Sequence, residues 1–154
     1  MHFRKPVRLV ALFFAALTLI GLLTAADYGL PCDEPAEQVI LKENLKEYAC
    51  RLLGSGSDAV QAYDEAGIQR ISESVERDHG QAAYYLAAPL LALTDTAPDW
   101  MTTLWHAYTW LWFMVGVIAL YSLARGLGAS RPAACAASLL LYLSPRFFAE
   151  GHYN

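Results

Sequence analysis

The apolar residues of this chain are gathered into blocks, and the longest charge-free block near the N-terminus runs from Leu9 to Ala26. Its 18 residues would form a helix of about 27 Å, close to the thickness of a bilayer core. Arg4, Lys5 and Arg8 precede it, and basic flanks favour the cytoplasmic side of a membrane. The pattern therefore predicts a first transmembrane helix with a cytoplasmic N-terminus.

A secretory signal peptide is the alternative for this first block. Small residues in Leu23-Thr24-Ala25-Ala26 would suit a cleavage site. The length of the apolar block and the further apolar segments downstream favour a retained span, but cleavage stays open.

Two further blocks lie in the second half of the chain. Leu104 to Leu123 has about twenty residues without a formal charge, and it predicts a second span. Pro132 to Leu143 is shorter, and it spans a bilayer only if the helix continues through Ser144 to Phe148. Aromatic residues near the start of the second span suit an outer membrane interface: Trp100, Trp105, Tyr108 and Trp110.

The region between the spans predicts shorter helices. Residues 35–53 are expected to form an amphipathic helix closed by Gly54, and residues 59–77 a second, polar helix. Apolar residues recur on one face of the first helix, whereas its Lys and Glu residues fall largely elsewhere: Leu41, Leu45, Tyr48 and Leu52. Ala82 to Leu93 is too short to span, and it predicts a juxtamembrane or re-entrant helix.

Composition and charge agree with this division. Hydrophobic residues make up 56% of the 154 and charged residues 17%, with a mean hydropathy of +0.27. Of the 15 acidic residues, twelve lie in residues 27–82. We expect an all-α integral membrane protein with about three spans: a first transmembrane helix (1–26), an extracytoplasmic acidic loop of juxtamembrane amphipathic helices (27–103), and the second and third spans (104–154). The basic residues are too sparse to indicate nucleic-acid binding.

Cys32 and Cys50 fall in the acidic segment and Cys135 in an apolar one, without CxxC or Cys/His spacing. In an oxidising compartment Cys32 and Cys50 are candidates for a disulfide, and two free thiols are the alternative. The sequence predicts no metal ligands.

The acidic group that follows the first span contains the first candidate catalytic residues. Asp33 and Glu34 lie between two prolines and just outside the predicted membrane surface. A carboxylate in that place is a candidate general base. The alternative is structural: Asp33 would cap the helix that starts near Pro35, with Glu34 and Glu37 favouring its positive end.

His79 and Arg146 are the other candidates. His79 lies between Asp78 and Gly80, where metal binding, proton transfer and phosphate binding compete with a simple turn role. Arg146 stands among aromatic residues at the end of an apolar segment and needs an anionic partner. Either Glu150 at i+4 or a phosphate headgroup would serve.

The order of these features resembles the GT-C membrane glycosyltransferases, and within them the protein O-mannosyltransferase-like group, glycosyltransferase family 39. A cytoplasmic start, one span and an early Asp33-Glu34 pair are followed by the His79 segment and a Trp/Leu-rich span. The third apolar segment then ends in Leu-Ser-Pro-Arg-Phe-Phe-Ala-Glu-Gly-His-Tyr-Asn at Leu143 to Asn154, which is similar to bacterial members of the group. The resemblance covers essentially the whole chain but only the family's N-terminal portion.

The resemblance implies transfer of a sugar from a polyprenyl-phosphate donor to an acceptor at the extracytoplasmic face. Asp33 would then be the catalytic base, Glu34 its support, and Arg146 and His79 the candidate donor-phosphate residues. Gly80 departs from the His-Pro-Pro that many eukaryotic members carry. The metal requirement stays open, with a divalent ion as one option.

Two other classes of function stay open. One is a complete small membrane protein that serves as a non-catalytic scaffold or partner, and the other is a transporter fragment whose intramembrane arginine and acids line a pathway. In each case we expect the chain in the plasma membrane, with its N-terminus cytoplasmic. The last apolar segment lies directly before the end at Asn154, so we expect the chain to be the beginning of a longer protein.

Overall fold

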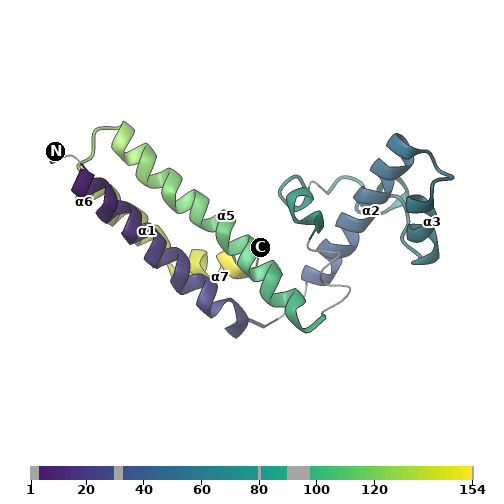
Figure 1. The fold of residues 1–154 in the computed structure, drawn as a ribbon, viewed down its shortest axis with the longest axis horizontal. Coiled ribbons are helices and arrows are strands. Elements are labelled where there is room, and N and C mark those ends of the chain that lie inside the picture. The colour runs from purple at the N-terminus through teal and green to yellow at the C-terminus, as the bar shows by residue number, and fades with distance from the viewer. Residues whose placement is uncertain (1–3, 30–32, 80, 90–97, 154) are drawn as a thin grey trace. The chain divides into compact units, whose positions relative to one another are not determined.

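The computed structural model describes residues 4–29, 33–79, 81–89 and 98–153, and these residues contain six α-helices and no β-strand (Figure 1). The expected all-α class is confirmed.

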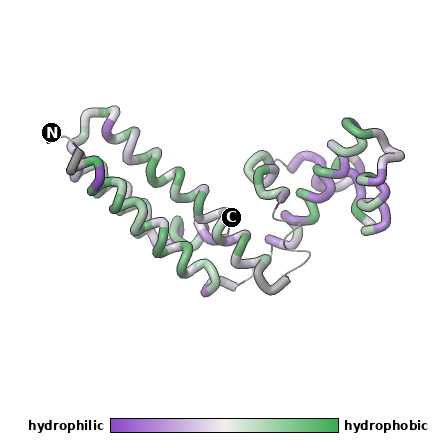
Figure 2. Tube along the Cα trace, viewed as in Figure 1, coloured by the Kyte–Doolittle hydropathy of each residue, from purple (hydrophilic) through white to green (hydrophobic). Residues whose placement is uncertain are grey.

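The chain divides into two compact units, which are described separately. The first, here called the bundle unit, comprises Met1–Leu30 and Thr94–Asn154. The second, here called the polar unit, comprises Pro31–Leu93. Apolar residues dominate α1 and α5 of the bundle unit, whereas hydrophilic residues cover much of α2 and α3 of the polar unit (Figure 2).

In the bundle unit, α5 is the helix against which the others pack. The elements are α1 (Arg4–Thr24), the 3-10 helix η1 (Ala25–Asp27), α5 (Pro98–Gly126), α6 (Arg131–Tyr142) and α7 (Pro145–Tyr153).

Two segments of the bundle unit are long and apolar enough to cross a membrane. They are Val7–Asp27, with 21 residues, and Met101–Gly126, with 26. The pair Arg131–Tyr142 and Pro145–His152 meets the same criteria together but bends by 68° at the break, so the unit holds two candidate spans, or three if the bent pair is one span. Large apolar side chains point outward along these helices, as lipid contact requires, among them Leu9, Leu12, Leu23, Val115 and Leu140.

The interior of the bundle unit is aromatic and apolar. One cluster of buried side chains joins α1, α5 and α6: Phe14, Leu17, Trp110, Met114, Val117 and Tyr142. The Trp110 indole donates to the Thr18 carbonyl at 3.1 Å, and the Tyr142 hydroxyl to the Leu17 carbonyl at 3.2 Å. Gly21 makes this approach possible, because a Cβ there would lie 1.8 Å from Cε2 of Trp110.

The polar unit is built on α2 (Glu34–Leu53), which ends at Gly54 with a φ of 87°. The other elements are α3 (Asp58–Glu65), η2 (Ile71–Glu73) and η3 (Tyr84–Ala87). The helix predicted over 35–53 is therefore confirmed in its extent and in its end at Gly54. The segment predicted over 82–93 contains η3, and its residues 90–93 lie outside the described ranges.

The polar helix predicted over 59–77 is wrong in extent, because α3 ends at Glu65. Gly67 adopts a φ of 70° and its N–H donates to the Asp64 carbonyl, while the Ile68 N–H donates to the Tyr63 carbonyl. These two bonds form a Schellman motif, which satisfies the last carbonyls of a helix and turns the chain away.

The buried face of α2 also differs from expectation. Leu41 is fully buried, but Tyr48 is 46% and Leu52 80% exposed. The face that packs inward carries Glu43, Lys46 and Glu47 instead. Each finds a partner from a later segment, so ion pairs and hydrogen bonds replace part of an apolar core.

Candidate functional site

Asp33 stands directly before α2 with an exposed side chain. It occupies the N-cap position, but its side chain makes no capping hydrogen bond, so the predicted capping role is wrong. The cause lies in its backbone, whose φ of −95° and ψ of −22° are helical, whereas a capping residue is typically extended. Only its carbonyl takes part, accepting from the Glu37 N–H at 3.0 Å. The Asp33 carboxylate is therefore left at the surface.

Glu34, the first residue of α2, has the opposite environment. Its side chain is buried, and Oε1 accepts a hydrogen bond from Nε2 of Gln38 at 3.2 Å. Adjacent residues at a helix start point in different directions, and this separates one exposed from one buried carboxylate. Only Asp33 of the pair is open to a second molecule within this unit.

His79 is held by acidic residues of the polar unit. Its Nε2 lies 3.1 Å from Oε1 of Glu37, and its Nδ1 lies 3.7 Å from Oε2 of Glu76. Nε2 of Gln81 donates to the Glu37 carbonyl at 3.0 Å and also to its carboxylate. The His79 side chain remains 41% exposed. Glu37 thus organises the segment around His79, a role that its position in the sequence does not reveal.

Glu47 is the centre of an ionic network in the polar unit. Its carboxylate accepts from Arg70 through Nε and Nη2, each at 2.9 Å, from the Ser72 hydroxyl at 2.7 Å, and from Nε of Arg51 at 2.8 Å. These bonds, led by the one from Arg70, hold the pKa of Glu47 far below its ordinary value. Glu47 is 4% exposed. We assign Glu47 a role in stabilising the fold, since its carboxylate oxygens already accept hydrogen bonds from neighbouring side chains.

Arg146 is the second residue of α7 and its side chain is exposed. Among the ion pairs in the described residues, none joins it to Glu150, the partner expected at i+4. The guanidinium is therefore available to an anion from outside the bundle unit.

A buried cluster of His152 and aromatic rings lies in the bundle unit, and it includes Trp110, which was expected at the outer membrane interface but is fully buried. The His152 ring is fully buried and stacks on Tyr28 at 4.1 Å and on Trp110 at 4.2 Å between ring centroids. Its Nε2 lies 3.1 Å from the Gly21 carbonyl oxygen, and its Nδ1 lies 3.0 Å from that of Phe148. These contacts fasten α7 to α1 and so fix the helix that carries Arg146.

A second buried histidine, His106 of α5, lies near the same end of α1. Its Nδ1 is 3.0 Å from the Ala25 carbonyl oxygen. Its ring meets that of Tyr28 edge to face.

Within the described ranges, no group of three or more His, Cys, Asp or Glu side chains is placed to hold a metal ion. Cys50 and Cys135 are free thiols. The disulfide considered for Cys32 and Cys50 involves a residue outside the described ranges.

No protein-family model, curated protein or solved structure matches this chain. The similarity to glycosyltransferases consequently stays a prediction that rests on the residues quoted for it.

Proposed function

We propose that the chain is the N-terminal part of a membrane glycosyltransferase that moves a sugar from a polyprenyl phosphate to an acceptor on the extracytoplasmic side. The observation that carries the proposal is the exposed Asp33 carboxylate, which follows a candidate span in the sequence and takes no part in capping its helix. A general base needs a carboxylate within hydrogen-bond reach of the acceptor, and a surface carboxylate without an intramolecular task meets that need.

In the proposed reaction Asp33 accepts the proton of the acceptor hydroxyl as its oxygen bonds to the anomeric carbon of the sugar. The bond between that carbon and the phosphate oxygen breaks, and the polyprenyl phosphate leaves with the electron pair. Arg146 would bind the donor phosphate, because a guanidinium pairs with phosphate through two parallel hydrogen bonds. Glu34 would support Asp33, and His79 would be a secondary phosphate contact.

The test compares turnover in the protein expressed from its complete reading frame, with Asp33→Asn as the variant. We expect a loss of roughly 10²–10⁴-fold in rate, with expression unchanged. Asp58→Asn is the matched control, since Asp58 is also an exposed aspartate at a helix start. Full turnover by the Asp33 variant would refute the catalytic proposal.

The proposal also requires the polar unit to be extracytoplasmic, as the basic N-terminal flank predicts. Cysteines introduced at the exposed Ser55 and Leu127 report the two sides, in a background that lacks the natural thiols. We expect a membrane-impermeant reagent to label the first in intact cells and the second only after permeabilisation. The reverse pattern would exclude an extracytoplasmic Asp33.

A further inference from the structure

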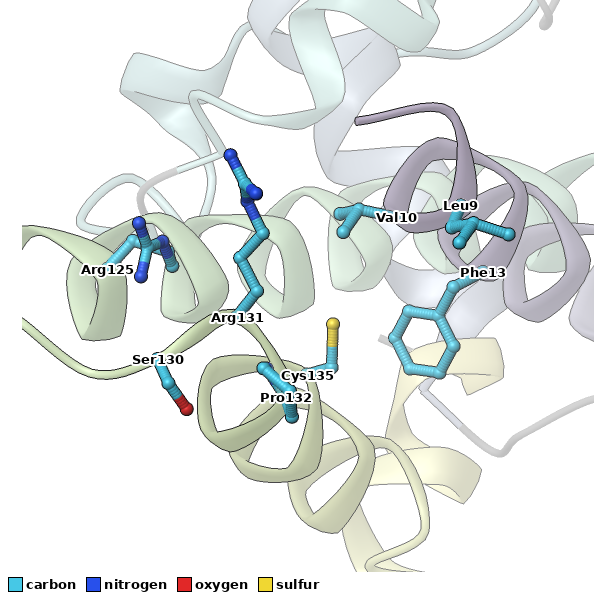
Figure 3. A pocket seen from close by; sticks show the side chains of 8 residues that line it. All are labelled: Leu9, Val10, Phe13, Arg125, Ser130, Arg131, Pro132 and Cys135. Carbon is cyan, nitrogen blue, oxygen red and sulfur yellow. The ribbon is translucent and has the colours of Figure 1, made fainter. Parts of the chain in front are cut away.

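A hollow of about 720 Å³ lies among α1, α5 and α6 of the bundle unit (Figure 3). It combines an apolar wall with two arginines: Leu9, Val10, Phe13, Arg125, Ser130, Arg131, Pro132 and Cys135. A second hollow of about 520 Å³ shares Val10, Arg125 and Arg131 with it. The two arginines therefore stand between neighbouring recesses on the bundle unit.

The chain turn between α5 and α6 holds the arginines in place. Gly128 adopts a φ of 91°, which lets the chain reverse between the two helices. Nη1 of Arg125 donates to the Ala129 carbonyl. No ion pair in the described part of the chain engages Arg125 or Arg131. The remaining guanidinium N–H groups are thus available to an anion.

Charge around the hollow is of one sign. Residues 1–26 and 100–149, which include every residue of the hollow, contain no aspartate or glutamate. The charges of Arg125 and Arg131 therefore have no carboxylate in these two stretches to compensate them. This end of the bundle unit favours an occupant that carries negative charge.

The apolar wall defines the rest of the occupant. Phe13 and the Cys135 thiol face the space between α1 and α6, and Leu9 and Val10 continue the wall along α1 (Figure 3). A free phosphate would leave this wall bare, whereas a phospholipid matches both parts. Basic recesses between membrane helices at a bilayer surface suit anionic headgroups.

We propose that this hollow is a binding site for one anionic phospholipid, with its phosphate between Arg125 and Arg131 and an acyl chain against Phe13 and Cys135. The site is separate from the proposed glycosyl transfer and does not depend on it. The lipid would bridge α1 and α6 where these helices leave the space between them unfilled.

The test is a titration of the detergent-solubilised protein, expressed from its complete reading frame, with short-chain phosphatidylglycerol or phosphatidylcholine, followed by native mass spectrometry. We expect one phosphatidylglycerol to bind in preference to phosphatidylcholine. The double variant Arg125→Ala/Arg131→Ala should weaken it roughly 10- to 30-fold, from about 1 kcal/mol for each arginine near a membrane surface. Arg8→Ala, which removes an exposed charge of the α1 start outside the hollow, should cost less than about threefold.

Cys135→Trp tests the apolar part without changing charge, because an indole would fill the recess. It should reduce binding as strongly as the double arginine variant, with helicity by circular dichroism unchanged in both. Equal loss with Arg8→Ala, no preference for the anionic lipid, or equally tight binding of glycerol phosphate would each overturn the proposal. A dimer of the wild type that Cys135→Trp disrupts would also overturn the proposal, since a second copy of the protein would then occupy the hollow.

Discussion

The two units of this chain differ in the charged side chains that they bury. The bundle unit closes around Trp110, Phe14 and Tyr142, and its exposed surface is largely apolar. The polar unit buries Glu43, Lys46 and Glu47 on α2, and ion pairs and hydrogen bonds join that helix to the segments that follow. Close packing of aromatic and apolar side chains therefore stabilises the bundle unit, whereas ion pairs and hydrogen bonds contribute more to the polar unit. The same contrast predicts which perturbation each unit will resist.

Close packing in the bundle unit gives the largest expected effect. Gly21→Ala places a methyl group 1.8 Å from Cε2 of Trp110, so α1 and α5 must separate. Overpacking of this kind costs typically 1–3 kcal/mol and occasionally more, and we expect about 3 kcal/mol here because a helix backbone and a buried indole both resist movement. Chemical denaturation in micelles, followed by tryptophan fluorescence, measures the loss.

Gly116→Ala is the matched control for that variant, since Gly116 lies in α5 with no heavy atom within 4 Å of an added Cβ. Alanine favours helix over glycine by roughly 1 kcal/mol, so this variant should be neutral or slightly stabilising. Equal losses at both positions would mean that the Gly21 contact does not govern stability.

The ionic network of the polar unit gives the next effect. Glu47→Gln removes the charge that Arg70, Ser72 and Arg51 share, while keeping nearly the same volume. We expect a loss of about 1–3 kcal/mol, since the three donors lose a charged acceptor that is itself buried, but Arg70 and Arg51 keep contact with solvent. Segment-resolved hydrogen exchange should show faster exchange in α2 and 70–72, with α5 unchanged. Glu65→Gln, at an exposed position, should change neither.

The same carboxylate predicts how the polar unit responds to acid. The pKa of Glu47 is lowered on folding, so its contribution is fully present above the unfolded value of about 4.3 and is lost as pH falls toward the folded pKa. The polar unit should therefore become less stable below about pH 4.3. Glu47→Gln should flatten that dependence. If the stability of the polar unit falls equally steeply with pH in the wild type and the variant, other carboxylates are responsible for the loss.

The sequence predicted the parts of this fold that depend on local pattern. The apolar blocks from Leu9 to Ala26 and from Leu104 to Leu123 can be recognised without any tertiary contact, because span length is a property of a continuous segment. The bend of 68° before Pro145 was not predicted. The end of α3 at Glu65 was missed, since the weak signal of Gly67 became decisive only through the Schellman bonds.

The contacts in the interior of each unit could not be predicted from the sequence, for a different reason. Glu47 and Arg70 are 23 residues apart, and Gly21 and His152 are 131 apart, so only the folded chain brings them together. At the candidate site, the sequence selected Asp33 as a candidate base, with helix capping as the alternative, and its side chain makes no capping bond because its backbone angles are helical. The pairing of His79 with Glu37 was likewise decided by tertiary packing.

The smallest expected effect separates a structural from a functional role for His79. Its contacts with Glu37 and Glu76 lie at a surface where the imidazole is 41% exposed, so His79→Ala should cost less than about 1 kcal/mol. Asp78→Asn, whose side chain is 96% exposed and lies 4.0 Å from Arg77, is the control and should have no measurable effect. Hydrogen exchange of 76–79 measures both. In the protein from the complete reading frame, an unchanged KM for the lipid donor with His79→Ala would leave only the structural role. A raised KM with unchanged hydrogen exchange would instead identify His79 as a donor-phosphate contact, and its contact with Glu37 would then serve to orient the ring.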